Sequence, residues 1–275
     1  MIVLYVFLAI LCGLCALAIL VGLAYLFVFV RPRGRAPEDK RLLCDYAHRG
    51  LHNETIPENS LAAFEAACRK GFGIELDVQL SSDGEVMVFH DYTLIRMAGT
   101  DGKLCDLTVE ELQKLSLRGT EQTIPTFSEV LALVDGRVPL LVELKGEDLN
   151  TALCPKVAAL LKEYKGAYCI ESFNPMLLRA MRKELPNAYY GQLYTNVCKE
   201  KGKVTFLNVL LNLMAFNFLA RPDFIAYNVL CRHSIPVLLT TKLYTAGRFV
   251  WTVRDKTALQ VAHDQGEHPI FEQIG

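Results

Sequence analysis

The chain has 275 residues, of which 52% are hydrophobic, and a formal net charge of −1. It carries no lysine- and arginine-rich block and no basic stripe, so nothing in its charge indicates a nucleic-acid partner. After a short N-terminal segment, the remaining length suits one α/β barrel or two small domains.

The first segment, Ile2 to Val30, is an uninterrupted run of apolar and small residues. As a helix it exceeds the roughly 30 Å of bilayer hydrocarbon and can span it with some tilt. A cleaved signal peptide is the alternative, but it would have a positive charge before a shorter apolar region. We therefore predict an uncleaved single-pass anchor in the cell membrane. Basic residues follow it, from Arg31 to Arg41, so the positive-inside rule places the remaining chain in the cytoplasm.

Cysteine usage agrees with that compartment. The nine cysteines are an odd number without framework spacing, which suits a reducing environment better than a disulfide scaffold. We predict an anchor over residues 1–30, a charged linker over 31–44 and a barrel domain over 45–275.

Short β-rich apolar runs alternate with helical patterns through this domain, as expected of βα units on a parallel sheet. Eight runs predict strands, the number in a TIM-type (β/α)8 barrel, although two half-barrels would have the same pattern. Ser60 and a capping box from Thr108 to Glu111 indicate helix starts. The predicted strands are 42–48, 73–80, 85–90, 138–145, 167–173, 188–194, 223–228 and 249–254, and the predicted helices are 61–70, 108–116, 128–134, 154–164 and 175–185.

The segment from Val204 to Ala220 contains no charged residue. Thr205, Asn208 and Asn212 fall near one face of a helix and leave a broad apolar arc. One interpretation is an outer helix packed on the sheet, but such a helix normally exposes charge to water. The other is an interfacial or lid role. Both remain open at this point.

Three carboxylates lie near the ends of two predicted strands. Glu75 and Asp77 share one face of their strand because residues two apart point the same way. The C-terminal ends of barrel strands meet at one mouth, so Glu143 is expected beside them. Any single carboxylate could belong to a solvated strand edge, but Glu75 and Asp77 lie inside an apolar run, where unpaired charge is costly. Crowded carboxylates need a cation, and oxygen ligands suit Mg²⁺ or Ca²⁺.

Two histidines and two cations accompany these carboxylates. His48 and His90 end two other predicted strands, and cleavage of a phosphate diester needs a base and an acid that imidazole can supply. One such histidine is usually structural, whereas two beside an acidic cluster favour catalysis. Arg49 and Lys145 are candidates for holding the phosphate. Glu58, in a loop before a helix, could cap that helix, reach the metal, or do both.

These motifs resemble those of the glycerophosphodiester phosphodiesterase family. Its sequences carry His-Arg-Gly, Pro-Glu-Asn-Ser/Thr, Glu-x-Asp-Val, a strand ending in His-Asp, and Glu-Leu/Ile-Lys. The resemblance covers essentially Asp45 to the C-terminus. The chain has, in the same order, His48-Arg49-Gly50, Pro57-Glu58-Asn59-Ser60, Glu75-Leu76-Asp77-Val78, His90-Asp91 and Glu143-Leu144-Lys145.

The resemblance implies a TIM-type barrel with a divalent ion, Mg²⁺ or Ca²⁺, held by Glu75, Asp77 and Glu143. It implies that His48 accepts a proton and that His90 donates one. The expected reaction is hydrolysis of glycerophosphodiesters to an alcohol and sn-glycerol 3-phosphate. Either water or a hydroxyl group of the substrate can be the first nucleophile.

Departures from the family pattern lie in the second half. Val250-Trp251-Thr252-Val253 matches the penultimate strand, which makes Trp251 a further substrate-binding candidate. Arg254, however, stands where Asn is common, and Pro269-Ile270-Phe271-Glu272 replaces a Gly-Ile-x-Thr-Asp ending. With the anchor and the uncharged segment 204–220, which could also contact the membrane, a lysophospholipase D is the alternative function. A non-catalytic barrel that binds lipid head groups is less favoured, because no catalytic position is degenerate.

Overall fold

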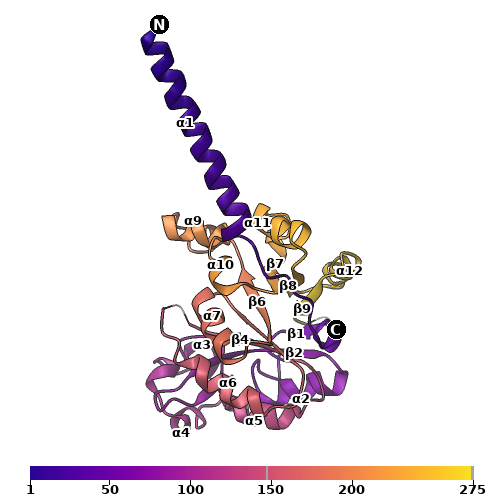
Figure 1. The fold of residues 1–275 in the computed structure, drawn as a ribbon. Helices are drawn as coiled ribbons and strands as arrows, with labels where there is room; N and C mark the ends of the chain where they lie inside the picture. The colour runs from indigo at the N-terminus through magenta and orange to yellow at the C-terminus, as the bar shows by residue number, and fades with distance from the viewer. Residues whose placement is uncertain (147, 274–275) are drawn as a thin grey trace.

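A computed structural model describes residues 1–146 and 148–273. Eight parallel strands form a closed barrel, in which β1 pairs with both β2 and β9 (Figure 1). The predicted TIM-type barrel is therefore confirmed. The barrel strands are β1 (Tyr46–Ala47), β2 (Gly73–Leu80), β4 (Leu140–Leu144), β5 (Tyr168–Ser172), β6 (Tyr189–Tyr194), β7 (Phe224–Asn228), β8 (Gly247–Val253) and β9 (His268–Phe271).

One predicted strand lies outside the barrel, and one barrel strand was missed. The prediction over 85–90 corresponds to β3 (Val86–Val88), which pairs antiparallel with β2. The connection between them, 81–85, is a tight turn, and parallel strands need a longer crossover. The eighth barrel strand is β9, whose four residues include Pro269, a residue that weakens a strand signal.

Helices surround the barrel, and several begin at the predicted caps. Ser60 accepts a hydrogen bond from the backbone N–H of Ala63, and Thr108 forms a capping box with Glu111. The predicted helix 128–134 begins one residue earlier, because Thr126 caps it. The helices of this part are α2 (Leu61–Lys70), α3 (Ile95–Ala98), α4 (Val109–Leu112), α5 (Phe127–Val134), α6 (Leu153–Glu163), α7 (Pro175–Glu184), α8 (Val197–Glu200), α9 (Phe206–Asn212), α10 (Asn217–Ala220), α11 (Ile235–Leu238) and α12 (Lys256–Asp264).

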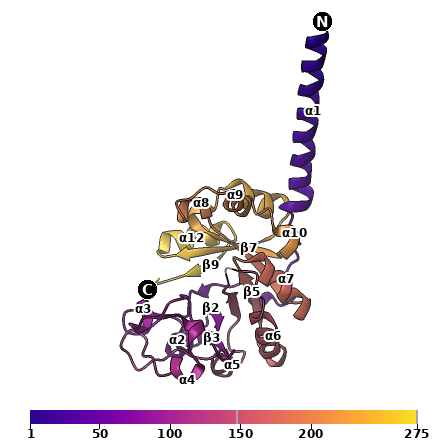
Figure 2. The same ribbon diagram turned by 90° about the vertical axis from the view of Figure 1, so that its left-hand side faces the viewer.

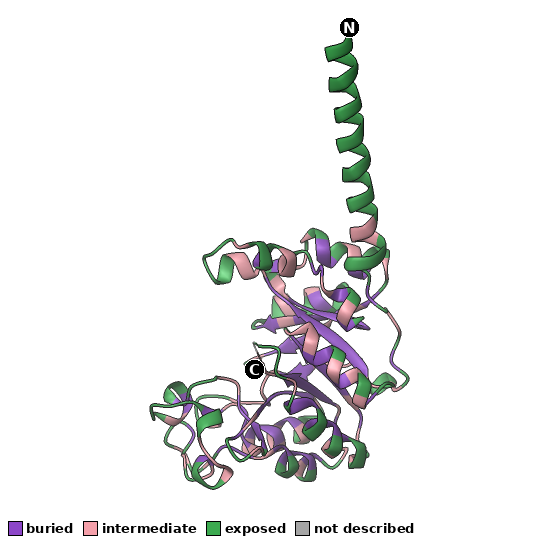
Figure 3. Cartoon of the chain, turned by 60° about the vertical axis from the view of Figure 1, so that its left-hand side comes forward, coloured by how far each residue is buried: buried purple, intermediate pink, exposed green. Residues whose placement is uncertain are grey.

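The strands are buried on both faces (Figure 3). Alternate residues, such as Leu141 on β4 and Cys169 on β5, fill the barrel interior. Their neighbours, such as Val142, pack outward against the helices. Because side chains alternate along a strand, the next inward positions after Leu141 and Cys169 are Glu143 and Glu171. The inward rows therefore change from apolar to acidic toward the mouth.

An N-terminal helix, α1 (Ile2–Ala24), continues into a π-helical turn, η1 (Tyr25–Phe29), and projects away from the barrel (Figure 2). Among the described residues, Ile2–Phe29 is one helical stretch long and apolar enough to cross a membrane. Its C-terminal end contacts the barrel's outer helices. The Tyr25 hydroxyl donates to the carbonyl of Leu213 (3.0 Å), and buried Asn217 donates to the carbonyl of Val30 (2.9 Å).

The uncharged segment 204–220 forms two short helices, α9 and α10, instead of one. Met214 between them has a positive φ of 49°. Asn208 and Asn217 are buried, whereas Phe206 is 81% exposed. A polar side that packs inward and an apolar side that faces outward are the reverse of an ordinary outer barrel helix.

Candidate active site

Three buried carboxylates lie together at the barrel mouth. Glu75 and Asp77 project inward from β2, and Asp77 pairs in register with Glu143 of the neighbouring strand β4. One oxygen of each carboxylate lies within 4.8 Å of the other two. The predicted convergence of two strands on one cluster therefore matches the geometry of the described residues.

The electrostatics of this cluster suit a divalent cation. Burial, followed by repulsion from Asp77 and Glu143, raises the pKa of Glu75 well above its usual range. Burial also raises the pKa of Glu143, although Lys145 opposes it. Burial disfavours ionised Asp77 as well, but Lys145, His90 and Arg49 outweigh it and lower the pKa of that carboxyl. Asp77 Oδ1 is buried without a hydrogen-bond donor, and its charge partner is Lys145 Nζ at 3.4 Å, so this oxygen has room for a cation as a further partner.

Two cations flank the carboxylates. Lys145 Nζ lies 3.0 Å from Glu143 Oε1 and 3.4 Å from Asp77 Oδ1. The backbone N–H of Arg49, a residue with a positive φ of 55°, donates to Glu75 Oε2 at 2.8 Å. Its guanidinium Nε lies 3.7 Å from Asp77 Oδ2. The left-handed backbone at Arg49 thus directs both its amide and its side chain to the acidic cluster.

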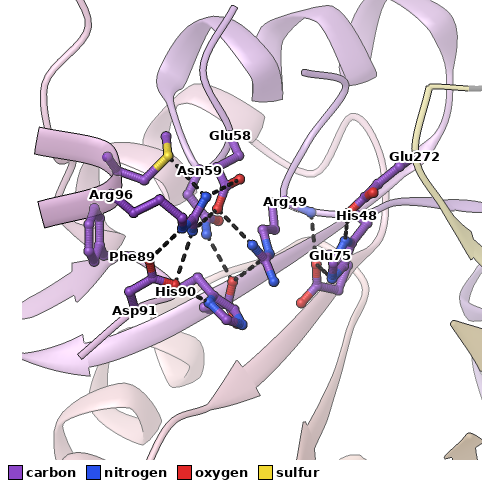
Figure 4. A network of polar contacts seen from close by, with 12 residues as sticks. His48, Arg49, Glu58, Asn59, Glu75, Phe89, His90, Asp91, Arg96 and Glu272 are labelled. Atoms are coloured by element: carbon purple, nitrogen blue, oxygen red, sulfur yellow. Dashed lines mark hydrogen bonds and ion pairs between the residues drawn. The ribbon is translucent and has the colours of Figure 1, made fainter. Parts of the chain in front are cut away.

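His48 is held by a carboxylate from the last strand's end. Its Nδ1 lies 2.5 Å from Glu272 Oε1, and its Nε2 lies 3.8 Å from Glu75 Oε2 (Figure 4). Burial lowers the pKa of His48, although Glu272 favours the protonated ring. Burial opposes ionisation of Glu272, but His48 and Arg254 outweigh it and lower the pKa of that carboxyl to about 2. The imidazole is therefore oriented by an ionised carboxylate.

His90 has a similar arrangement. Its Nδ1 lies 2.6 Å from Asp91 Oδ1, and Arg96 Nε donates to the other oxygen of Asp91 at 2.6 Å. The side-chain amide of Gln79 donates to the backbone carbonyls of Phe89, His90 and Asp91, which fixes this loop. Both histidines thus have a carboxylate on Nδ1, which leaves Nε2 as the ring nitrogen outside this contact.

Glu58 lies between two arginines. It accepts hydrogen bonds from Arg49 (2.7 Å) and from Arg96 (2.7 and 3.0 Å). Among the described residues Glu58 takes neither of its predicted positions, at the helix cap or in the carboxylate cluster, since Ser60 caps α2 and the cluster's oxygens come from Glu75, Asp77 and Glu143. The neighbouring Asn59 donates to Asp77 Oδ2 at 2.9 Å. This loop therefore orients Arg49 and Asp77.

The mouth contains a cavity of about 160 Å³. Trp251 stands in its wall, donates to the carbonyl of Ala226 (2.9 Å) and packs edge-on against Phe173, with ring centroids 5.7 Å apart. Asp77, Lys145 and Glu58 do not line this cavity. Of the predicted site residues, those that line the cavity are His48, Arg49, Glu75, His90, Glu143 and Trp251.

Sequence reasoning missed Arg96, Glu272 and Glu171. The first two need tertiary contacts to be found, since they act on residues far away in the chain. Glu171 had a signal, because it ends a predicted strand as Glu143 does. It is 1% exposed and lines the cavity. Burial, then repulsion from Glu143 and Asp77, raises the pKa of Glu171 well above its usual range.

Comparison with known proteins agrees with this geometry. A sequence model of the glycerophosphoryl diester phosphodiesterase family matches residues 48–272. The chain is 38% identical over 159 residues to a glycerophosphodiester phosphodiesterase of Caldanaerobacter subterraneus, covering 54% of this chain and 65% of that protein. It is 32% identical over 148 residues to mouse glycerophosphodiester phosphodiesterase 1, covering 50% and 44%. The matched part covers less than two thirds of the length of either relative.

Solved structures share the fold over a longer range. An Oleispira antarctica phosphodiesterase, solved with the product sn-glycerol-3-phosphate, superposes with a TM-score of 0.67 at 23% identity, over 83% of this chain and 92% of that one. A glycerophosphodiester phosphodiesterase of Thermotoga maritima superposes with a TM-score of 0.63 at 26% identity, over 83% and 94%.

Proposed function

The chain belongs to the glycerophosphoryl diester phosphodiesterase family, and we propose that it hydrolyses glycerophosphodiesters to an alcohol and sn-glycerol 3-phosphate at a membrane surface, with a divalent metal ion. The observation that carries this proposal is the buried carboxylate cluster between two carboxylate-held histidines at one barrel mouth.

The residues present fit a hard divalent cation. Glu75, Asp77 and Glu143 would hold Mg²⁺ or Ca²⁺ through oxygen atoms, the ligands that both ions prefer. When bound, the cation neutralises these carboxylates and polarises a phosphoryl oxygen. Lys145 already partners two of them at 3.0 and 3.4 Å, so a divalent ion and this ammonium together balance the cluster's charge.

The two histidines would move the protons. His48, neutral because burial lowers its pKa, accepts a proton from the attacking hydroxyl group, whether that belongs to water or to the substrate. Glu272 stabilises the imidazolium that forms. His90, held by Asp91, donates a proton to the leaving alkoxide.

The cations and the tryptophan would position the substrate. Arg49 and Lys145 attract the phosphate and stabilise the charge that develops on it. Glu58 holds Arg49 in place through a 2.7 Å hydrogen bond. Trp251 would present an apolar wall to the uncharged part of the substrate.

Release of glycerol 3-phosphate from glycerophosphocholine, with and without a chelator, tests this mechanism. We expect His48→Ala to lower kcat by roughly 10²–10⁴-fold, and chelation to abolish activity until Mg²⁺ or Ca²⁺ is restored. His263→Ala is the matched control, because that histidine pairs with Asp45 away from the cavity. Full activity of the His48 variant or after metal removal would refute the mechanism.

The membrane location rests on α1 and on an apolar rim beside it. We propose that residues 1–30 anchor the chain, that 31–44 form the linker, and that the barrel, 45–275, lies in the cytoplasm against the bilayer. Phe29 packs edge-on against Phe218 of α10, with centroids 5.5 Å apart, which supports a bilayer surface near α10. We define the apolar rim as the exposed residues Val204, Phe206, Leu207, Leu230 and Ile235.

This rim supports a second candidate function, a lysophospholipase D. Its residues belong to segments that follow the C-terminal ends of β6 and β7, which open at the mouth. Figure 1 shows α9 and α11 on either side of the lower end of α1. An acyl chain leaving the bilayer could therefore lie along the rim while its head group enters the cavity.

A pair of substrates separates the two functions. If the rim guides acyl chains, the double variant Phe206→Ser/Leu230→Ser should lower turnover of lysophosphatidylcholine at least about tenfold. Each substitution removes an apolar side chain whose contact with the acyl chain contributes roughly 1.5–3 kcal/mol. Turnover of glycerophosphocholine should not change. Leu149→Ser, at an exposed leucine (78%) in the segment after β4 and outside the rim, is the control for loss of an apolar side chain. Equal effects on both substrates would remove the case for the acylated substrate.

A further inference from the structure

A fourth carboxyl group lies beside the carboxylate cluster and has no role in the mechanism above. Glu171 of β5 pairs in register with Glu143 of β4. Because both face inward from neighbouring parallel strands, their side chains lie next to each other at the mouth. Glu171 is 1% exposed, so it is as buried as Glu75.

Glu171 stands apart from the metal-holding set. The mutually close oxygens within 4.8 Å come from Glu75, Asp77 and Glu143 among the described residues, and Glu171 is not one of that group. Its Oε2 atom is buried without a hydrogen-bond partner. Over residues 1–146 and 148–273, no salt bridge joins it to a lysine or arginine. An unpartnered buried carboxyl group is costly, so stability does not explain it.

The position of Glu171 in the cavity suggests which ligand group it meets. The cavity is lined by two cations, Arg49 and Arg254, and by the aromatic rings of Phe173 and Trp251, which pack on each other. Glu171 lines the same cavity. An anionic phosphate would avoid a carboxyl group and favour Arg49, which leaves the uncharged part of the substrate for Glu171.

We propose that Glu171 is a substrate-binding residue that accepts a hydrogen bond from a free hydroxyl group on the carbon chain esterified to the phosphate. This inference rests on the proposed hydrolysis of glycerophosphodiesters and names what the site selects. Hydroxyl groups donate readily to carboxyl oxygens. A site built to bind a hydroxyl group also rejects analogues that lack it, because its own polar group is then left buried and unpaired. The site would therefore prefer diesters of polyols over diesters of simple alcohols.

A cycle of enzyme and substrate changes tests this assignment. The full-length protein, its Glu171→Gln variant and its Glu171→Leu variant are compared on glycerophosphocholine and on 2-hydroxypropyl phosphocholine, which lacks the terminal hydroxyl group but keeps the one that could act as nucleophile. The wild type should prefer glycerophosphocholine in kcat/KM, on the order of 10- to 100-fold for the lost hydrogen bond. Glu171→Gln should retain most of this preference, since an amide oxygen also accepts. Glu171→Leu should lose it, mainly through KM, and keep its activity on the hydroxypropyl diester.

Other outcomes would overturn the proposal. A leucine variant that still prefers the glycerol diester, or that loses both activities equally, would assign Glu171 to another role. Equal turnover of both diesters by the wild type would overturn the assignment even if a variant fails to fold. If the wild type hydrolyses neither diester, the proposed function itself fails and the assignment fails with it. A melting temperature of Glu171→Leu at or above that of the wild type would show that the lost preference is not a folding defect.

Discussion

At the residue scale, two of the positions that depart from the family pattern, Arg254 and Glu272, contact each other. Arg254 Nε donates to Glu272 Oε2 at 2.9 Å, and the other oxygen of Glu272 holds His48. The end of β9, although its sequence departs from the family pattern, thus supplies the carboxylate of Glu272 to the imidazole of His48. His48 and Arg254 together keep this carboxylate ionised. Such outer partners set the tautomer and orientation of a catalytic histidine.

A change at Glu272 should therefore alter the pH dependence of catalysis. The base form of His48 is neutral, so activity is lost as pH falls through its pKa. Burial lowers that pKa from 6.5, whereas Glu272 raises it. In Glu272→Gln the main influence that raises the pKa of His48 is lost, whereas burial and Arg49 still lower it, so the acid limb of kcat against pH should move to lower pH. We also expect kcat to fall by less than the roughly 10²–10⁴-fold of general acid–base catalysis. An acid limb displaced upward would contradict the pairing. Glu163→Gln, the same change at an exposed glutamate at the end of α6, is a control for the loss of charge alone.

At the scale of elements, the barrel interior depends on a glycine between aromatic rings. Gly191 of β6 pairs in register with Phe224 of β7. A Cβ atom at Gly191 would lie 2.0 Å from a ring carbon of Phe224. That ring in turn packs on Phe249, with centroids 4.3 Å apart, and on Tyr189, at 4.8 Å. The missing side chain on β6 makes room for a stack that closes the barrel below the site.

The substitution Gly191→Ala should destabilise the barrel by about 1–3 kcal/mol, because overpacking forces a buried ring to move. Urea unfolding measures the change. Combining it with Phe224→Leu should cost less than the sum of the two single changes, since a smaller side chain accommodates the new methyl group. Strict additivity would show that the two residues do not share this space.

At the scale of the whole molecule, the linker is fastened beneath the barrel. Asp223, fully buried just before β7, lies 3.9 Å from Arg33, 3.8 Å from Arg35 and 3.4 Å from Arg182. Arg35 also donates to the carbonyls of Asn187 and Ala188. Three arginines from two distant segments thus share one carboxylate. This cluster holds the chain after α1 against the end of the barrel where the strands begin.

Replacing Asp223 with Asn should release this linker. Because the substitution removes the buried negative charge, the arginines lose their partner. We expect the free energy of unfolding to fall by about 1–3 kcal/mol. Trypsin should then cut after Arg33 or Arg35 faster than in the wild type. Glu38→Gln is the control, because Glu38 is an exposed partner of Arg35 at 3.8 Å and exposed pairs contribute little. Unchanged proteolysis of the Asp223 variant would show that other contacts hold the linker.

The sequence by itself determined the βα alternation, the caps at Ser60 and Thr108, the N-terminal apolar helix and the inward parity of Glu75 and Asp77. These features follow from local rules, since side chains alternate along strands and caps act within four residues. Strand parity applied to β5 would also have found Glu171. The family motifs added the expected assignment of roles.

Only the tertiary structure decided which strands close the barrel and which partners hold the site. The antiparallel β3 and the short β9 were misjudged, because closure depends on pairings between segments far apart in the chain. The contact of Glu272 with His48 spans 224 residues, and Arg96 reaches Glu58 across 38. No local pattern encodes such contacts. They exist because the closed sheet brings every strand's C-terminal end to one mouth, where distant polar groups become each other's nearest neighbours.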